Sequence, residues 1–117
     1  PQSYADLHGQ TVFDGADAGL GSREFFEQAD ARLCEWNHNL HLPGAPFGRL
    51  YPYERYRGRR VLEVGCGMGG MAAMWARQGA RVTAVDLNPV AVAQTRRRFE
   101  LFGLEGDVRQ SDGRELP

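Results

Sequence analysis

A glycine-rich stretch, residues 59–70 (RRVLEVGCGMGG), most constrains how this chain can fold. A short apolar run with one acid inside it stops at the first of four glycines, and Met71, Met74 and Trp75 then take up helical spacing. Residues 61–65 are typical of a buried parallel strand, and glycines allow positive φ and a close approach of the backbone to a ligand. We expect a strand, a tight turn and a helix whose free N–H groups point at whatever binds on the turn.

Two more strand and helix signals follow this stretch. Residues 81–85 (RVTAV) predict a strand that ends at Asp86, and Asn88 can cap a helix that starts with proline and is closed by Gly103. Residues 107–110 predict a third, short strand. Alternating strands and helices imply parallel strands joined by right-handed crossovers. The predicted fold class is therefore α/β, with a Rossmann-like parallel sheet and flanking helices, preceded by a helical N-terminal segment.

The second predicted helix has an apolar stripe. Its residues at helical spacing are Val92, Thr95, Phe99 and Phe102, and we expect them to face inward. The three consecutive arginines 96–98 are expected to form the solvated face of this helix.

The first 58 residues are expected to form a lead-in, and residues 59–117 a partial Rossmann-like domain. Residues 1–21 show no sustained period and are assigned no structure. Ser22 can cap an amphipathic helix over about residues 22–40, because apolar side chains recur there three or four residues apart.

Residues 47–60 mix aromatic side chains with arginines, and three interpretations are open. Tyr51, Tyr53 and Tyr56 could cover the edge of the sheet while the arginines reach water. The same residues could bind nucleic acid, with guanidinium groups on phosphates and rings stacked on bases. We favour the first interpretation, because the net charge of the chain is −1 and nucleic-acid-binding domains are usually basic. In the third, one aromatic side chain closes over a ligand held by the glycine turn.

Composition narrows the class of protein. The chain has 117 residues, of which 42% are hydrophobic and 25% charged, and this is enough for one modest core. It has no apolar run long enough to span a membrane and no N-terminal signal segment, so a cytoplasmic location is expected. The two cysteines fit neither a disulfide framework nor a metal site, and His38 and His41 are interpreted as a surface pair; we expect no metal. The first residue is proline, which suggests that the chain begins inside a longer one.

The candidate site lies where the three predicted strands end, since parallel sheets bind ligands beyond the carboxyl ends of their strands. Gly65, Gly67 and Gly70 satisfy the G-x-G-x-x-G pattern of dinucleotide folds, and Asp86 lies about twenty residues further on, as a ribose acceptor should. An NAD(P)-binding oxidoreductase is therefore one candidate. Glu63 argues against it, because a carboxylate beside the turn repels a pyrophosphate and attracts a cation. A ligand with a ribose, an adenine and a positively charged amino-acid end fits better.

Three motifs in register resemble those of class I S-adenosylmethionine-dependent methyltransferases, in the small-molecule branch that includes the ubiquinone and menaquinone C-methyltransferases. Residues 63–69 (EVGCGMG) resemble the first motif, E/D-x-G-x-G-x-G. Residues 85–89 (VDLNP) resemble the second, and residues 106–113 (GDVRQSDG) the region of the third strand. The resemblance covers residues 59–117 and implies S-adenosylmethionine as the cofactor, with a small-molecule methyl acceptor and not a nucleic acid. A non-catalytic module that binds the donor stays open as an alternative.

The resemblance also implies roles for single residues. The donor-binding set is Glu63, Gly65, Cys66, Gly67, Gly69, Asp86, Leu87, Asp112 and Gly113. Glu63 would hold the methionine ammonium, the three glycines would let the backbone lie against methionine and ribose, and Asp86 would accept both ribose hydroxyls. Leu87 would pack on the adenine face, Asp112 would accept from the adenine amino group, and the Gly113 N–H would reach a ring nitrogen.

Each of these residues also has a structural interpretation. Glu63 could pair with Arg59 or Arg60, since an acid inside an apolar strand needs some partner. Asp86 could cap the next helix, and Asp112 could be an ordinary turn aspartate. The Cys66 thiol is interpreted as inert packing between glycines, because no base is evident beside it.

The resemblance implies a complete sheet of seven strands in the order 3-2-1-4-5-7-6. This chain would hold three of them and leave strand 61–65 without its outer neighbour. We therefore expect a fragment of a longer enzyme that binds the donor weakly by itself. No catalytic residue is assigned, because methyl transfer is an in-line displacement in which the protein mainly supplies alignment.

Overall fold

The computed structural model describes residues 19–36, 38–112 and 114. Its centre is a three-stranded sheet built from alternating strands and helices. In chain order these elements are β1 (Arg60–Val64), α3 (Gly70–Arg77), β2 (Arg81–Asp86), α4 (Pro89–Leu101) and β3 (Gly106–Gln110). The predicted strand and helix positions are confirmed to within one or two residues.

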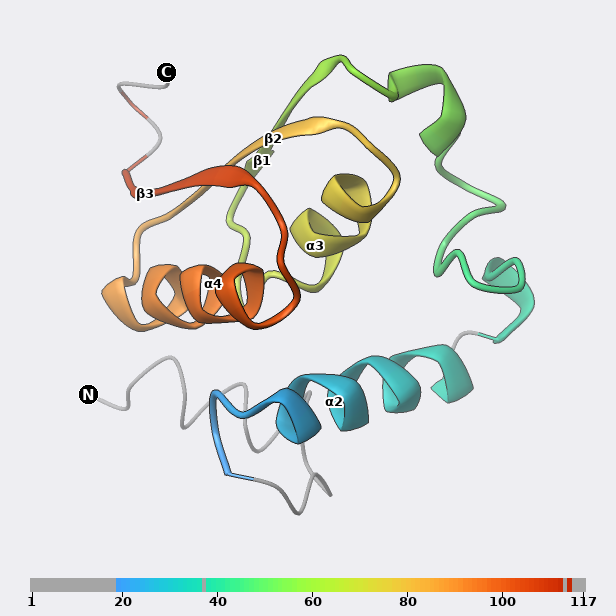
Figure 1. Cartoon of the computed structure of the whole chain (residues 1–117), viewed down its shortest axis with the longest axis horizontal. Coiled ribbons are helices and arrows are strands. Elements are labelled where there is room, and N and C mark those ends of the chain that lie inside the picture. Colours follow the sequence, from blue (N-terminus) through green and yellow to red (C-terminus); the bar gives the residue numbers. More distant parts are fainter. Residues whose placement is uncertain (1–18, 37, 113, 115–117) are drawn as a thin grey trace.

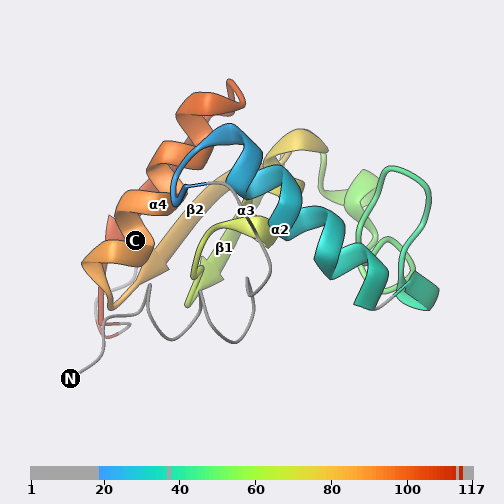
Figure 2. The ribbon, with the colours of Figure 1, turned by 90° about the horizontal axis from the view of Figure 1, so that it is seen from below.

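The three strands run parallel in the order β1-β2-β3. Val61 of β1 lies beside Val82 of β2, and Val82 lies beside Gly106 of β3. The α-helices of the described residues, α2 (Arg23–Trp36), α3 and α4, lie on one face of the sheet, as Figures 1 and 2 show from two directions. This arrangement confirms the α/β, Rossmann-like class and places β1 at an edge of the sheet, as expected.

The core forms where α3 and α4 pack on the sheet. Its fully buried residues include the small side chains Ala72, Ala73 and Ala84 together with Phe99. Small residues let the helices approach the strands closely, and Phe99 fills the space that is left. The packing leaves no room at Gly106, where an added Cβ would lie 2.4 Å from Cε2 of Phe99.

Helix α2 (Arg23–Trp36) precedes the sheet and packs on α4. The Phe25 N–H donates to Oγ of Ser22 at 3.1 Å, which confirms the predicted cap. Phe26 is fully buried and packs edge-on against Phe102. The helix ends earlier than residue 40, and a short 3-10 helix, η1 (His38–Leu40), follows. Residues 37–39 (NHN) have low helix propensity, which favours an end of the helix at this point.

The aromatic segment contains a second 3-10 helix, η2 (Tyr53–Tyr56). The ring centroids of Tyr51, Tyr53 and Tyr56 lie 5.8, 4.7 and 5.5 Å from that of Trp75 on α3. The three tyrosines therefore surround the indole of Trp75, which is itself partly buried against the core. Their expected cover of the sheet edge stays a prediction. Tilted and edge-on ring pairs at such distances stabilise a cluster beyond its buried area.

One prediction about α4 is wrong. Arg98 is only 1% exposed, although the three arginines 96–98 were expected on the solvated face. Residues three apart share a helix face, so Arg98 follows Thr95 into the buried side. Arg96 behaves differently: its side chain is exposed, and it donates twice to the Val108 carbonyl oxygen.

Among the described residues, the model contains no helix of the length and apolarity that crossing a bilayer requires.

Candidate donor-binding site

The glycine turn joins β1 to α3 at the carboxyl ends of the strands. Gly65, Gly67 and Gly69 have φ of 75°, 58° and 83°, in the left-handed region that side chains disfavour. The Gly65 and Cys66 N–H groups donate to the Val85 carbonyl oxygen at 2.8 and 3.0 Å, so the turn lies against the end of β2. An added Cβ at Gly65 would meet nothing within 4 Å, and the backbone there is open to a ligand.

Helix α4 supports the turn from the protein side. The Thr95 hydroxyl is fully buried and donates to the Gly67 carbonyl oxygen at 2.9 Å. An added Cβ at Gly69 would lie 2.8 Å from Cγ2 of Thr95. The structure thus gives Gly69 a packing role at the contact between the turn and α4, and its proposed contact with the donor stays a prediction.

Asp86, at the end of β2, connects the turn to the next helix. Its carboxylate is buried; Oδ2 accepts from the Gly67 N–H at 3.0 Å, and Oδ1 accepts from the Asn88 N–H at 2.9 Å. Asn88 caps α4 by accepting from the Val90 N–H at 2.8 Å, as predicted. An ionised carboxylate oxygen can accept more than one hydrogen bond, so these contacts leave capacity for a ligand hydroxyl.

Glu63 is half-buried, and one of its carboxylate oxygens has no hydrogen-bond partner in the described structure. Its Oε2 atom is buried and accepts no hydrogen bond. Burial raises the pKa of this carboxyl to about 7. Arg59 and Arg60 are exposed and form no ion pair with it, so the alternative of a structural ion pair is not realised in the described part of the chain. An orphaned acid beside an open backbone turn is the arrangement that a cationic ligand would satisfy.

Cys66 lies within the turn and is buried. Burial, with a smaller contribution from the negative charges of Asp86 and Glu63, raises the pKa of its thiol to about 11. Its Sγ lies 3.6 Å from the Thr95 hydroxyl oxygen. A thiol held neutral at physiological pH is a poor nucleophile, in agreement with the packing interpretation. The two carboxylates that act on it give the turn a negative environment.

The other predicted contacts lie on the open side of the sheet ends. Leu87 follows Asp86 and is 69% exposed, so its apolar surface is available to a flat ring. Asp112 is exposed, and its Oδ1 accepts from the Arg114 N–H at 2.9 Å within its own turn. Its role toward adenine stays a prediction, and Gly113 lies outside the described residues.

Two residues that support the turn were not predicted as functional. Thr95 was assigned only to the buried stripe, and Arg98 to the solvated face. The signal for Thr95 was present, because a hydroxyl in an apolar stripe must find a buried partner. For Arg98 the sequence offered only a helical position three residues after Thr95.

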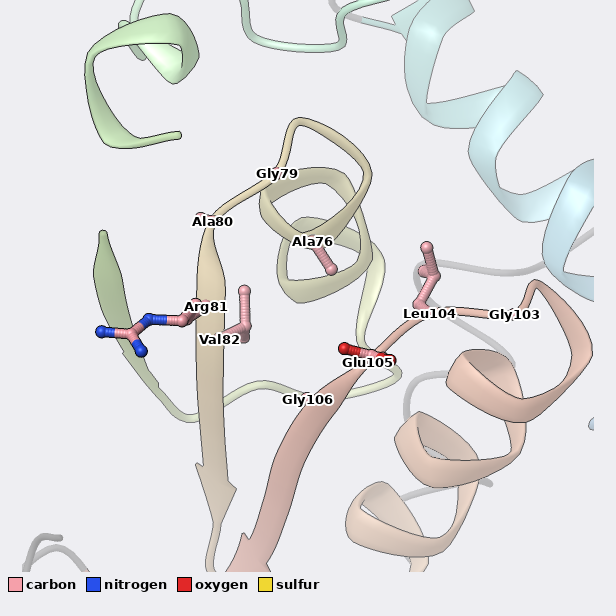
Figure 3. A pocket seen from close by; sticks show the side chains of 9 residues that line it. All are labelled: Ala76, Gly79, Ala80, Arg81, Val82, Gly103, Leu104, Glu105 and Gly106. Carbon is pink, nitrogen blue, oxygen red and sulfur yellow. The ribbon is translucent and has the colours of Figure 1, made fainter. Parts of the chain in front are cut away.

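A separate hollow of about 450 Å³ lies at the opposite end of the sheet. It is bounded by the end of α3 and by the starts of β2 and β3, with Arg81 and Glu105 as its charged residues (Figure 3). This hollow is remote from the glycine turn, which follows the end of β1. It is therefore distinct from the candidate site.

Comparisons with known proteins agree with this geometry. A family described as "Methyltransferase domain" matches residues 61–117. The chain is 53% identical over 55 residues to the ribosomal RNA small subunit methyltransferase C of Chromohalobacter salexigens, covering 47% of this chain and 16% of that protein. It is 39% identical over 75 residues to a ubiquinone biosynthesis O-methyltransferase of Methylocella silvestris, covering 64% of this chain and 29% of that protein. The fold matches an S-adenosylmethionine-dependent methyltransferase of Clostridium acetobutylicum with a TM-score of 0.51 at 16% identity, covering 97% of this chain and 37% of that one.

The parallel sheet, the glycine turn and the acids at the strand ends define a nucleoside-binding domain of Rossmann type. Residues 61–117 match the family described as a methyltransferase domain, and their fold is that of the first part of a class I S-adenosylmethionine-dependent domain. The methyl donor of this class is S-adenosylmethionine. The chain spans less than a third of the length of either relative.

Proposed function

We propose that this chain supplies the donor-binding part of an enzyme that transfers a methyl group from S-adenosylmethionine to a small molecule. The observation that carries the proposal is the buried, unpartnered Oε2 of Glu63 beside the open turn at Gly65. A buried carboxylate without a partner is costly, and the ammonium group of the donor would offset that cost. The same carboxylate would repel the pyrophosphate of a dinucleotide.

The remaining residues fit the other parts of the donor. The open backbone at Gly65 admits the methionine portion, and Asp86 has lone pairs left for ribose hydroxyls. The exposed side chain of Leu87 offers a surface to adenine. We assign Asp112 and Gly113 to the adenine edge, and Cys66 and Gly67 to the backbone of the turn. When bound, the donor supplies a sulfonium methyl group, and these residues bind and orient it.

The acceptor is proposed to be a small molecule. The net charge of −1 supports this class over a nucleic acid, because electrostatic attraction to phosphates supplies much of nucleic-acid affinity. The names of the relatives include both an rRNA enzyme and a ubiquinone-pathway enzyme, so the acceptor class must come from the complete protein.

Glu63→Gln tests the proposal, because it removes the charge while keeping the shape of the side chain. We expect calorimetric titration of the 117-residue chain with S-adenosylmethionine to show a Kd about 10–100-fold higher in this variant, since hydrogen bonds to charged groups contribute about 1.5–3 kcal/mol. Glu105→Gln is the matched control; it neutralises an exposed acid at the opposite end of the sheet and should leave the Kd unchanged.

NAD is the competing ligand in the same titration. Binding of NAD with an affinity that Glu63→Gln improves would support an oxidoreductase and refute the proposal. Equal donor affinities for the parent chain and Glu63→Gln would remove the ammonium role from Glu63.

A further inference from the structure

Arg98 of α4 is a buried charge with an unusual set of contacts. Its Nη1 donates to both carboxylate oxygens of Asp30 on α2, at 2.9 and 3.0 Å. Its Nε donates to the Met68 carbonyl oxygen at 3.0 Å, inside the glycine turn. The guanidinium carbon lies 4.5 Å from the centroid of the Phe26 ring, also on α2. One planar group thus bridges the N-terminal helix and the turn.

Thr95 makes the matching contact one helical turn earlier on α4. Its hydroxyl donates to the Gly67 carbonyl oxygen, while Arg98 donates to the carbonyl oxygen of the next residue, Met68. Two successive carbonyl groups of the turn are therefore held on the protein side. With both carbonyls fixed, the path of the turn backbone depends on where Thr95 and Arg98 sit.

The position of Arg98 depends in turn on Asp30. A guanidinium that is 1% exposed needs a charged partner, and Asp30 is the carboxylate that forms an ion pair with it. Asp30 also comes close to the start of α3, since an added Cβ at Gly70 would lie 3.9 Å from its Oδ1. Helix α2 lies outside the residues that the methyltransferase family matches.

We propose that Asp30 and Arg98 are positioning residues that couple the docking of α2 to the conformation of the glycine turn, and through it to donor affinity. This inference rests on the proposed function, because it takes the turn as the donor site. By thermodynamic linkage, donor binding must stabilise the docked α2 to the same degree that docked α2 strengthens donor binding. The N-terminal helix thereby becomes a regulatory element of the donor site.

Arg98→Lys is the first test. Lysine keeps a positive charge opposite Asp30, but it lacks the planar fork that reaches the Met68 carbonyl at the same time. We expect about a tenfold rise in the Kd for S-adenosylmethionine, measured where thermal unfolding shows the variant to be fully folded. Arg96→Lys is the matched control: Arg96 lies on the same helix and donates twice to the Val108 carbonyl, outside the turn, so its donor Kd should not change.

Asp30 provides a second test that leaves the guanidinium in place. Asp30→Asn should raise the donor Kd in the same direction, and Asp30→Glu, which retains the charge, should restore at least part of the affinity. A purely structural ion pair would lower the unfolding temperature of these variants without changing the donor Kd of the folded protein.

Hydrogen exchange gives a readout that needs no variant. We expect saturating S-adenosylmethionine to slow amide exchange in α2, and Arg98→Lys to reduce this effect. Unchanged exchange in α2 on donor binding, or equal donor Kd values for Arg98→Lys and Arg96→Lys, would overturn the inference.

The titrations also distinguish failure of this inference from failure of the proposed function. If the parent chain does not bind the donor, the proposed function fails. If Glu63→Gln weakens binding and Arg98→Lys does not, this inference alone fails.

Discussion

At the scale of single residues, Glu63 combines a cost to folding with a use in binding. Burial raises the pKa of its carboxyl to about 7 in the folded protein, because burial favours the neutral form. In the unfolded chain the same carboxyl ionises near pH 4.5. As pH rises from about 4.5 to 7, the unfolded chain ionises first and the folded state loses stability. Above pH 7 the loss is complete, and a shift of this size corresponds to about 3 kcal/mol.

The first prediction concerns protons and Glu63. A donor ammonium would favour the ionised carboxyl and lower its pKa, so donor binding at pH 7 should release a fraction of a proton. Titration calorimetry in buffers of different ionisation enthalpy measures this release, and Glu63→Gln should abolish it. The same variant should unfold at higher urea than the parent chain at pH 8, with the difference disappearing near pH 4. Equal stability of the two proteins at pH 8 would contradict a raised pKa.

At the scale of elements, the turn between β1 and α3 uses its glycines for two purposes. Gly65 and Gly69 both have positive φ, but their surroundings differ. Gly65 faces open space, whereas Gly69 has Thr95 where a side chain would be. The spacing in the sequence predicted glycines that approach a ligand, and the structure shows that at least one of them also allows the turn to pack on α4.

Alanine at Gly65 and alanine at Gly69 should therefore affect different properties: the first mainly donor binding, the second mainly stability. Gly65→Ala should cost only the strain of a left-handed alanine, about 1–2 kcal/mol of unfolding free energy, while its new Cβ obstructs the donor. Gly69→Ala adds a clash with buried Thr95 and should cost about 1–3 kcal/mol more. Urea denaturation and donor titration of both variants check this. Equal loss of stability in the two proteins would mean that Thr95 moves aside at little cost.

At the scale of the whole molecule, the described sheet has one strand paired on both sides and a strand at each of its two edges. Strand β2 pairs with β1 and β3, and β1 has no further strand beside it among the described residues. The Gly65 N–H faces β2, and the N–H groups of a strand alternate in direction. The N–H groups of Val64 and Leu62 therefore face the free edge of the sheet. The side chains of both residues are exposed as well.

Amide exchange followed by NMR should reproduce this topology. In β2 we expect slow exchange at Val82, Ala84 and Val85, which lie in the middle of the sheet. Exchange at Leu62 and Val64 should be faster by orders of magnitude than at Glu63, whose N–H faces β2. Strong protection of Leu62 and Val64 would show that a further strand pairs with this edge in solution.

Periodicity and turn chemistry predicted the elements around the sheet because these signals are local. A run of apolar residues stopped by glycine, the cap at Asn88 and the closing Gly103 each act within a few residues. The end of α2 was missed because the apolar spacing continues to residue 40, and the weak helix propensity of residues 37–39 is not a strong stop signal. The contact of the tyrosines with Trp75 was not predicted, because Trp75 lies on another element.

The sequence by itself determined the alternation of strands and helices along the chain and the set of glycines and acids at the strand ends, since these follow from patterns that the chain carries locally. Only the tertiary structure decided which of those groups are satisfied. It left Glu63 without a partner, tied Asp86 to the turn and buried Arg98 between α2 and the Met68 carbonyl. The physical reason is that burial and hydrogen bonding of a polar side chain depend on elements far away in the sequence, so no local pattern specifies them.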